Sequence, residues 1–268
     1  MSLKGRQIKG VLLDITGVLV EGTSDGPKAI KGSVKAVENL LKAGIQVRFV
    51  TNETQHTRAD LVRSLHGNGY SMPEQSVFPP ALAMASLIQE QNLNPYFVVH
   101  PNCLDDLKSK KSETSNQYDC VVFGDAVDGF SYRNMNKAFQ IVMKTGCKFY
   151  ALGKGKYYQD DGELQLDVGP FIAAMEFATE KSAVVVGKPS ADFFNAALKD
   201  MNLTAENALM VGDDVVSDVG GSQSCGLLGV LVRTGKYRPS DEKHPLVKPD
   251  MIVDNLEAIV KEILKKTA

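Results

Sequence analysis

Acids, hydroxyls, an amide and a lysine follow short apolar runs at four places in the sequence. The segments are Asp14-Ile15-Thr16-Gly17, Thr51-Asn52, Gly187-Lys188-Pro189 and Gly212-Asp213-Asp214 with Asp218. A carboxylate can act as a nucleophile or hold a cation, and lysine and hydroxyl groups bind anionic oxygens. The four segments together predict a site for an anionic substrate and a divalent cation.

The acidic segment is unusual because Asp213, Asp214 and Asp218 place three carboxylates within six residues. Two like charges about 4 Å apart repel by about 4 kcal/mol at an effective dielectric near 20. A solvated helix N-terminus, which favours acids, is the alternative interpretation. A divalent cation that bridges the acids and a phosphate oxygen removes the repulsion, and Mg²⁺ favours such a site. We therefore predict Mg²⁺ and a phosphorylated substrate here.

Each of the other segments also has an ordinary structural interpretation. Asp14, Thr51 and Asn52 could shape turns or cap helices. Most lysines lie on the surface, but Lys188 is fixed between a glycine and a proline after an apolar run, which favours a buried cation. The combination favours a functional site, because ligands of parallel α/β sheets bind beyond the carboxyl ends of the strands.

Short apolar runs alternate with amphipathic stretches towards both ends of the chain. We expect strands at residues 10–13, 45–50, 183–186, 208–211 and 227–232. We expect helices from Ser33, which could cap the first, over residues 54–67, and after Pro189 and Ser190. Apolar runs without alternation are typical of strands buried on both faces. The pattern predicts an α/β fold with a doubly wound, Rossmann-like parallel sheet and all four segments at its strand ends.

The middle of the chain has more loops, including a Lys-Ser-rich stretch at residues 108–115. It lies between the second and third site segments, where an inserted domain would cover the site. We predict a core of residues 1–79 and 186–268 and an inserted α/β cap domain of residues 80–185.

Composition excludes several classes of protein. The 268 residues carry a formal net charge of −2 and no long basic block, so neither nucleic acid nor a membrane is an expected partner. Four scattered cysteines without metal-ligand spacing are typical of reduced thiols. The expected location is the cytoplasm, with the nucleus as a second option.

The motifs Asp-x-Thr-Gly-Val, Val-Thr-Asn, Gly-Lys-Pro and Gly-Asp-Asp-x-x-x-Asp resemble, in this order, those of the haloacid dehalogenase superfamily. The long insertion resembles the type-II-capped branch, which includes sugar-phosphate and phosphoglycolate phosphatases. Residues 152–158, 166–170, 212–221 and 233–242 resemble the phospholysine phosphohistidine inorganic pyrophosphate phosphatases of that branch. Haloacid dehalogenase-like domain-containing proteins of uncertain substrate are the nearest competing group.

The resemblance implies a role for each candidate residue. Asp14 would be the nucleophile and a metal ligand, Thr16 would offer its main-chain carbonyl to Mg²⁺, and Asp213 would bind the ion. Asp214 and Asp218 would act on the ion through water or through its ligands. The implied substrate contacts are Asp14, Ile15, Thr16, Thr51, Asn52 and Lys188, and Lys188 would also orient the nucleophile.

Thr16 departs from the general pattern of the superfamily. Most of its phosphatases have a second aspartate at this position, which acts as general acid and then as base. A hydroxyl has no useful pKa near 7 for that work. The resemblance and this departure together lead us to expect phosphohistidine, phospholysine, free or as protein side chains, and pyrophosphate as substrates.

Several alternatives stay open. The chain could be a phosphomonoester phosphatase of the same superfamily, a phospho-acceptor signalling domain, or a catalytically weak phospho-binding scaffold. The roughly hundred-residue insertion speaks against the signalling domain. Lys154, Lys156, Tyr157 and Tyr158 form a basic-aromatic cluster that either governs substrate choice or is a solvated turn. The resemblance also implies a homodimer, with which the apolar stretch 171–177 is compatible.

Overall fold

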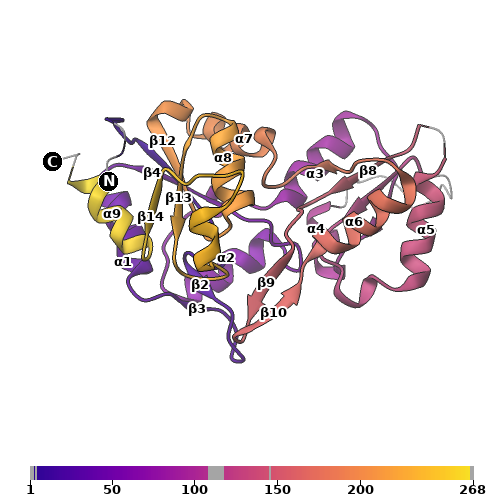
Figure 1. Ribbon diagram of the computed structural model, residues 1–268, viewed down its shortest axis with the longest axis horizontal. Helices are drawn as coiled ribbons and strands as arrows, with labels where there is room; N and C mark the ends of the chain where they lie inside the picture. The colour runs from indigo at the N-terminus through magenta and orange to yellow at the C-terminus, as the bar shows by residue number, and fades with distance from the viewer. Residues whose placement is uncertain (1–2, 4, 108–117, 145, 266–268) are drawn as a thin grey trace.

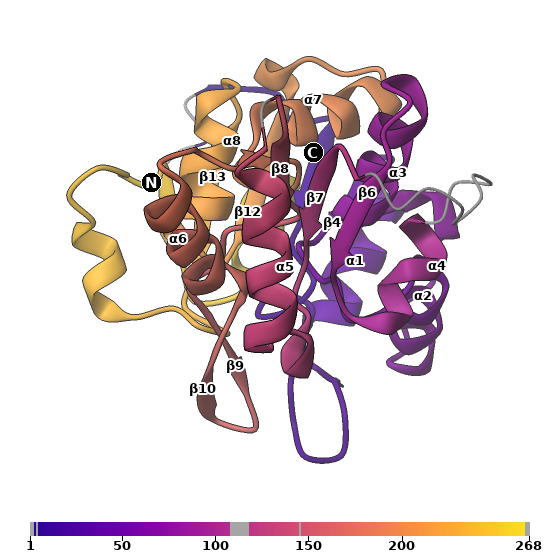
Figure 2. The same ribbon diagram turned by 90° about the vertical axis from the view of Figure 1, so that its right-hand side faces the viewer.

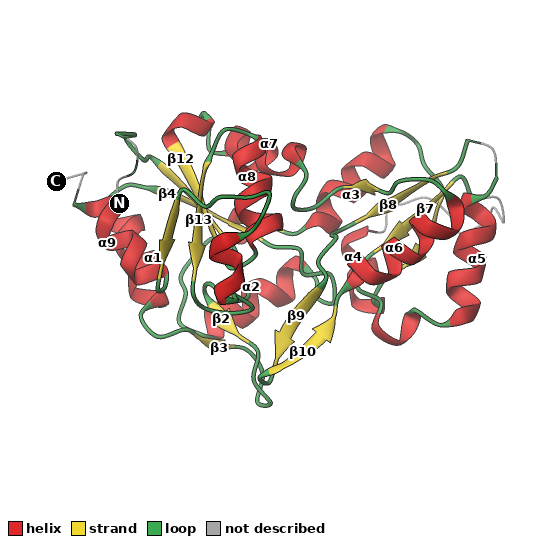
Figure 3. Ribbon diagram, in the orientation of Figure 1, coloured by secondary structure: helices red, strands yellow, loops and turns green. Residues whose placement is uncertain are grey.

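Two sheets, each made of parallel strands, lie one beside the other along the longest axis of the computed structural model (Figure 1). The structure describes residues 3, 5–107, 118–144 and 146–265, so the whole Lys-Ser-rich stretch at 108–115 lies outside the described residues. Helices lie on both faces of each sheet (Figure 3).

The larger sheet has the strand order β14-β13-β12-β1-β4-β5, and every neighbouring pair is parallel. Its strands are β1 Gly10–Leu13, β4 Gln46–Val50, β5 Val77–Phe78, β12 Ala208–Gly212, β13 Leu228–Val232 and β14 Met251–Val253. Leu13 lies opposite Phe49 on one side and Val211 on the other. The residues that follow these three central strands therefore leave the sheet at one edge.

The central strands bury both faces against different helices. Val11 and Leu13 pack with α1 Ser33–Lys42, α2 Arg58–Gly67 and α9 Leu256–Leu264, whereas Leu12 packs with α7 Ala191–Asp200 on the opposite face. A short helix, α8 Gly221–Ser224, precedes β13. Helices on both faces of a parallel sheet make a doubly wound α/β core, which confirms the predicted fold class.

The smaller sheet has the order β11-β8-β7-β6 and is also parallel. Its strands are β6 Pro95–Val98, β7 Cys120–Phe123, β8 Lys148–Ala151 and β11 Val184–Val185. Helices α5 Tyr132–Val142 and α6 Val168–Thr179 cover one face (Figure 2), and α3 Pro80–Glu90 and α4 Leu104–Leu107 cover the other. This is the inserted α/β cap of the predicted fold, and its exact boundaries stay a prediction.

Two hairpins meet beside the larger sheet (Figure 1). One consists of β2 Val20–Glu21 and β3 Lys28–Ala29, and the other of β9 Tyr157–Asp160 and β10 Glu163–Leu166. The main-chain N–H of Ser24 in the first donates to Asp161 in the second at 3.1 Å. This contact joins the inserted region to the core.

Some predicted element positions are wrong. The run at 183–186 forms β11 of the smaller sheet, not a strand of the larger one. Ser33 is the first residue of α1 rather than its cap, because its hydroxyl donates to the carbonyl of Ile30 and so joins the loop to the helix. Helix α2 begins at Arg58, after the cap Thr57. Helix α7 does follow Ser190 as predicted, with Ser190 in the N-cap position, but the Ser190 side chain makes no capping bond.

Among the described residues, no helix combines the length and the apolar character that a membrane-spanning segment needs.

Candidate active site

The carboxyl edge of the larger sheet opens into a cavity of about 520 Å³, which the hairpin β9–β10 also lines. The predicted residues on its wall are Asp14, Thr16, Thr51, Asn52, Lys188, Asp213, Asp214 and Asp218. The remaining one, Ile15, has a buried side chain in the core, and its main-chain N–H donates to Asp14 at 2.8 Å. The four sequence segments therefore meet in one place.

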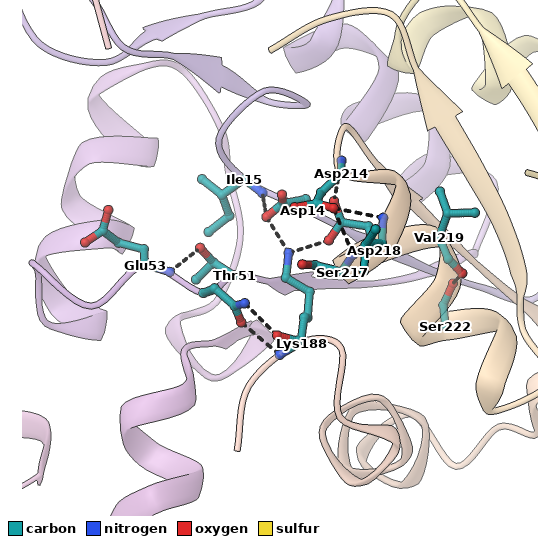
Figure 4. A network of polar contacts seen from close by, with 12 residues as sticks. Asp14, Ile15, Thr51, Glu53, Lys188, Asp214, Ser217, Asp218, Val219 and Ser222 are labelled. Carbon is teal, nitrogen blue, oxygen red and sulfur yellow. Dashed lines mark hydrogen bonds and ion pairs between the residues drawn. The ribbon is translucent and has the colours of Figure 1, made fainter. Parts of the chain in front are cut away.

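Lys188 joins two of the carboxylates (Figure 4). Its Nζ lies 2.8 Å from Oδ1 of Asp14 and 2.7 Å from Oδ1 of Asp218. Burial alone would lower the pKa of Lys188, but the two carboxylates outweigh this effect and raise it above its ordinary value. Lys188 therefore stays charged although it is only 2% exposed.

Asn52 holds the main chain of Lys188 in place. Its Nδ2 donates to the carbonyl of Lys188 at 2.8 Å, and its Oδ1 accepts from the N–H of Lys188 at 2.8 Å. Lys188 follows β11 of the smaller sheet, so the prediction that all four segments end strands of one sheet is wrong. The lysine reaches the site because Asn52, at the edge of the larger sheet, binds its backbone. Nδ2 carries a second hydrogen, which these two bonds leave available to a phosphoryl oxygen.

Asp213 is almost fully buried and has an oxygen with no partner. Its Oδ2 accepts from the main-chain N–H of Lys236 at 2.8 Å, whereas its Oδ1 accepts no hydrogen bond from any described residue. Gly17 and Gly235 both have positive φ angles, and a Cβ at either position would overlap the Asp213 carboxylate. Glycine is therefore required at both places for Asp213 to lie against the chain there.

The residues fit a divalent cation. Carboxylate oxygens of Asp14, Asp213 and Asp218 lie within 4.8 Å of one another. Burial raises the pKa of Asp213 well above its ordinary value and that of Asp218 to about 7; nearby carboxylates add to both shifts, while Lys236 and Lys188 respectively oppose them. Crowded buried acids and an unpaired carboxylate oxygen are what a cation with oxygen ligands would satisfy. Asp218 is itself a member of this cluster, whereas the sequence predicted only an indirect or water-mediated contact with the ion.

Asp214 belongs to a different set of contacts. Its Oδ1 accepts from the N–H groups of Val216 and Ser217 at 2.9 Å each, and so caps the π-helix Val215–Gly220. Its Oδ2 pairs with Nζ of Lys236 at 2.9 Å. Burial opposes ionisation, but Lys236 and these bonds outweigh it and lower the pKa of Asp214 to about 2. Asp214 thus anchors Lys236 beside the site.

Lys236 was not predicted from the sequence, although a signal for it existed. It follows β13, a strand of the larger sheet, and comes directly after a glycine, as Lys188 does. Burial would lower its pKa, but the neighbouring Asp214 and Asp213 raise it. Lys236 is half-buried, with a side chain 20% exposed, and is the second lysine on the cavity wall among the described residues.

Further cavity residues missed by the sequence analysis are Glu21, Glu53, Gln55, Asp125, Asp161 and Asp167. Asp125 follows β7, a strand end that the sequence analysis did not consider. Of the basic-aromatic cluster, Tyr158 lines the cavity. Lys154 instead pairs with Glu176 at 2.7 Å, and Tyr157 lies under the guanidinium of Arg238. These contacts favour the structural interpretation for Lys154 and Tyr157.

Thr51 lies beside the nucleophile candidate and is 2% exposed. Its Oγ1 accepts from the main-chain N–H of Glu53 at 3.0 Å, which leaves the hydroxyl proton available to a substrate oxygen. Figure 4 shows Thr51, Lys188 and Asp14 in one network.

Comparisons with known proteins agree with this geometry. The family described as haloacid dehalogenase-like hydrolase matches residues 11–111, and the one described as HAD-hydrolase-like matches residues 185–259. The chain is 48% identical over 261 residues to the human phospholysine phosphohistidine inorganic pyrophosphate phosphatase, covering 96% of this chain and 95% of that protein. It is 36% identical, with 97% of each covered, to the human haloacid dehalogenase-like hydrolase domain-containing protein 2.

Solved structures show the same fold. The crystal structure of a 4-nitrophenylphosphatase from Thermotoga maritima superposes with a TM-score of 0.83 at 23% identity, covering 95% of this chain and 97% of that chain. NagD from E. coli K-12 superposes with a TM-score of 0.79 at 24% identity, covering 94% and 98%. The sequence identities and the fold lead to one conclusion: the chain belongs to the haloacid dehalogenase-like hydrolase family, as a phosphatase of its capped, NagD-like branch.

Proposed function

We propose that this chain is a Mg²⁺-dependent phosphatase that works through a phosphorylated Asp14. The observation that carries the proposal is the ion pair between Asp14 and the buried Lys188, beside the unpaired oxygen of Asp213. Asp14, Asp213 and the main chain of Thr16 would hold Mg²⁺, which when bound would neutralise the crowded carboxylates and the charge of the phosphoryl group.

The residues of the chain account for both halves of the reaction. A carboxylate oxygen of Asp14 attacks phosphorus as the bond to the leaving group breaks, and an aspartyl phosphate forms. Lys188 orients Asp14 and offsets negative charge, and the hydroxyl of Thr51 donates to a phosphoryl oxygen. Water then attacks the phosphorus, phosphate leaves and Asp14 is restored. Asp218 acts by holding Lys188 in position.

The proposed substrates are phosphohistidine, phospholysine and inorganic pyrophosphate. Thr16 cannot protonate an alkoxide leaving group, and general acid–base help is worth about 10²–10⁴-fold. The leaving group of protonated phosphohistidine is a neutral imidazole, that of protonated phospholysine is a neutral amine, and that of pyrophosphate is phosphate. None of these leaving groups needs much protonation by a general acid. The name of the relatives at 44–48% identity supports the same choice.

A phosphate-release screen tests this function. It compares phosphoramidates, pyrophosphate and alkyl monoesters such as phosphoglycolate, with Mg²⁺ and with excess chelator. We expect phosphoramidates and pyrophosphate to have the higher kcat/KM, and release to stop in chelator. A preference for alkyl monoesters would support a small-molecule phosphomonoesterase instead, and no turnover of any donor would support the phospho-binding scaffold.

The homodimer implied by the resemblance is also a proposal. Phe177 of α6 is 88% exposed, which suits an apolar contact with a second copy. Sedimentation at micromolar concentration tests it, and a single monomeric species would contradict it.

A further inference from the structure

One wall of the cavity carries negative charge that the proposed mechanism does not use. Asp125, after β7, and Asp167, after β10, both line it, together with Glu53. Among the described residues, Lys188 and Lys236 are the lysines on the cavity wall, and each already pairs with acids of the phosphoryl site. The carboxylates of the inserted region therefore face the substrate space without a paired cation.

Asp125 is fixed where the inserted region meets the core. It is buried, its Oδ2 accepts from Nε2 of Gln55 at 2.8 Å, and its Oδ1 accepts from the N–H of Val127 at 3.2 Å. Its own N–H donates to Oγ1 of Thr54 at 2.8 Å. Every one of these partners is neutral, so they hold Asp125 in place without bringing a positive charge to its carboxylate.

Asp167 is positioned by a helix end and a glycine. Its Oδ1 accepts from the N–H of Val168 at 2.6 Å at the start of α6. A Cβ at Gly155 would overlap Oδ2, so only glycine leaves room for the carboxylate at this place. Burial raises the pKa of Asp167 to about 6, Asp125 and Glu53 add to the shift, and Lys236 opposes it. The group is thus mostly ionised at pH 7.

We propose that Asp125 and Asp167 are specificity-determining residues that bind the positively charged leaving group of a phosphoramidate. The inference rests on the function proposed above. As the Asp14–phosphorus bond forms, the phosphorus–nitrogen bond breaks and its electrons go to the nitrogen. The leaving group departs as a neutral imidazole or amine only if it already carries a proton taken from solvent. Carboxylates beside it favour that protonated form, and they repel an anionic group such as the carboxylate of phosphoglycolate.

The test compares two substrates in matched variants. Asp125→Asn and Asp167→Asn keep the shape of each side chain and one of its accepting oxygens but remove its charge. Glu163→Gln, at an exposed position on β10 that is not among the cavity residues, is the control. Each protein is assayed with phospholysine, whose phosphoramidate nitrogen is protonated and cationic before the phosphorus–nitrogen bond breaks, and with p-nitrophenyl phosphate, which carries no positive charge at its leaving group.

We expect each aspartate variant to lose about tenfold or more in kcat/KM for phospholysine, as for a lost charge-assisted contact. We expect p-nitrophenyl phosphate hydrolysis to stay within about threefold, and Glu163→Gln to match the wild type on both substrates. Gly155→Ala crowds the Asp167 carboxylate and should also lose kcat/KM for phospholysine but not for p-nitrophenyl phosphate. This variant replaces Asp167→Asn in the test if Asp167→Asn does not fold.

An unchanged ratio between the two substrates, or equal losses on both, would overturn the role of Asp125 and Asp167 while leaving the proposed phosphatase function intact. A wild-type protein that turns over p-nitrophenyl phosphate but not phospholysine would contradict the proposed substrates, and this inference with them. Failure of the wild type on both substrates and on pyrophosphate would contradict the proposed function itself.

Discussion

At the level of single residues, Lys188 stabilises the buried carboxylates around it. It contacts both Asp14 and Asp218, and its removal would leave two buried acids without their cation. We expect Lys188→Met to lower turnover by more than about 100-fold, as loss of an electrostatic stabiliser does. Removing one partner of a buried ion pair also costs about 3–5 kcal/mol of unfolding free energy.

Urea unfolding and phosphate release measure the two effects, and Lys199→Met, at an exposed position on α7, is the matched control. The stability loss should shrink as the pH falls, because Asp218 can then take up a proton. A Lys188→Met protein as stable as the control near pH 8 would show that the pair does not hold this site together.

Asp167 should make the protein less stable as the pH rises. Its pKa is about 6 in the folded chain against 3.8 for the free group, so folding favours its protonated form. Ionisation of Asp167 therefore lowers the unfolding free energy of the wild type as the pH rises from about 4 through 6. Asp167→Asn has no such pH-dependent loss. Since the shift is about two units, the variant should be more stable near pH 7 by up to about 3 kcal/mol.

Unfolding curves of both proteins near pH 4 and pH 7 check this prediction, with Glu163→Gln to correct for loss of a surface charge. Burial, Asp125 and Glu53 raise the pKa of Asp167, whereas the N–H of Val168 and Lys236 lower it, so the sign of the net pKa shift depends on all five. A variant that is less stable than the wild type at pH 7, with the same gap at pH 4, would contradict it.

The sequence sufficed for most of the phosphoryl site because its residues lie next to strand ends in the chain. Asp14, Thr51 and Asp213 follow β1, β4 and β12, whose parallel pairing brings them to one edge. Lys236 follows β13 in the same way and could have been predicted. Asp167 could not, because it follows β10 of a hairpin outside both parallel sheets and reaches the cavity only through tertiary packing.

At the scale of elements, helix α1 provides an internal comparison between two adjacent leucines. Leu40 is 0% exposed in the core under the larger sheet, whereas Leu41 is 44% exposed. Leu40→Ala should cost about 2–5 kcal/mol of unfolding free energy, because it leaves a cavity in a close-packed core, and Leu41→Ala should cost less than about 1 kcal/mol. Equal losses in urea unfolding would show that α1 does not dock as described.

The elements that were predicted wrongly have a common physical reason. Residues 54–57 read as helix by their spacing, but Thr54 accepts a hydrogen bond from Asp125 of the inserted region instead. The run at 183–186 reads as a core strand, but it pairs with Tyr150 and Ala151 of the smaller sheet. Contacts of high sequence separation override local propensity in both cases, and periodicity carries no information about them.

At the scale of the whole molecule, Mg²⁺ should stabilise the fold. The ion would bind the folded chain, where Asp14, Asp213 and Asp218 converge, and not the unfolded chain. Binding at a hundredfold excess over Kd adds about 2.7 kcal/mol to the unfolding free energy. We expect Tm to rise with Mg²⁺ in the wild type and to stay nearly constant in Asp213→Asn. A rise of equal size in both, or with Na⁺ at matched ionic strength, would argue against a site at Asp213.

The cavity is closed by parts that lie far apart in the chain. The bond between Thr54 and Asp125 and the bond between Ser24 and Asp161 join the inserted region to the core. In the function that we propose, the phosphoryl chemistry belongs to strand ends of the larger sheet together with Lys188, and substrate choice belongs to Asp125 and Asp167 of the inserted region. This division explains why Asp14 could be assigned from motifs while the substrate could not.

Trapping the phosphoryl group on the protein tests the central claim most directly. The wild type is mixed with phospholysine and Mg²⁺, quenched in acid within one turnover, and digested for mass spectrometry. We expect a phosphoryl group on the peptide that contains Asp14, no such peptide in excess chelator, and neither phosphopeptide nor turnover in Asp14→Asn. A phosphoryl group on another residue, or phosphate release by Asp14→Asn within a few-fold of the wild type, would contradict it.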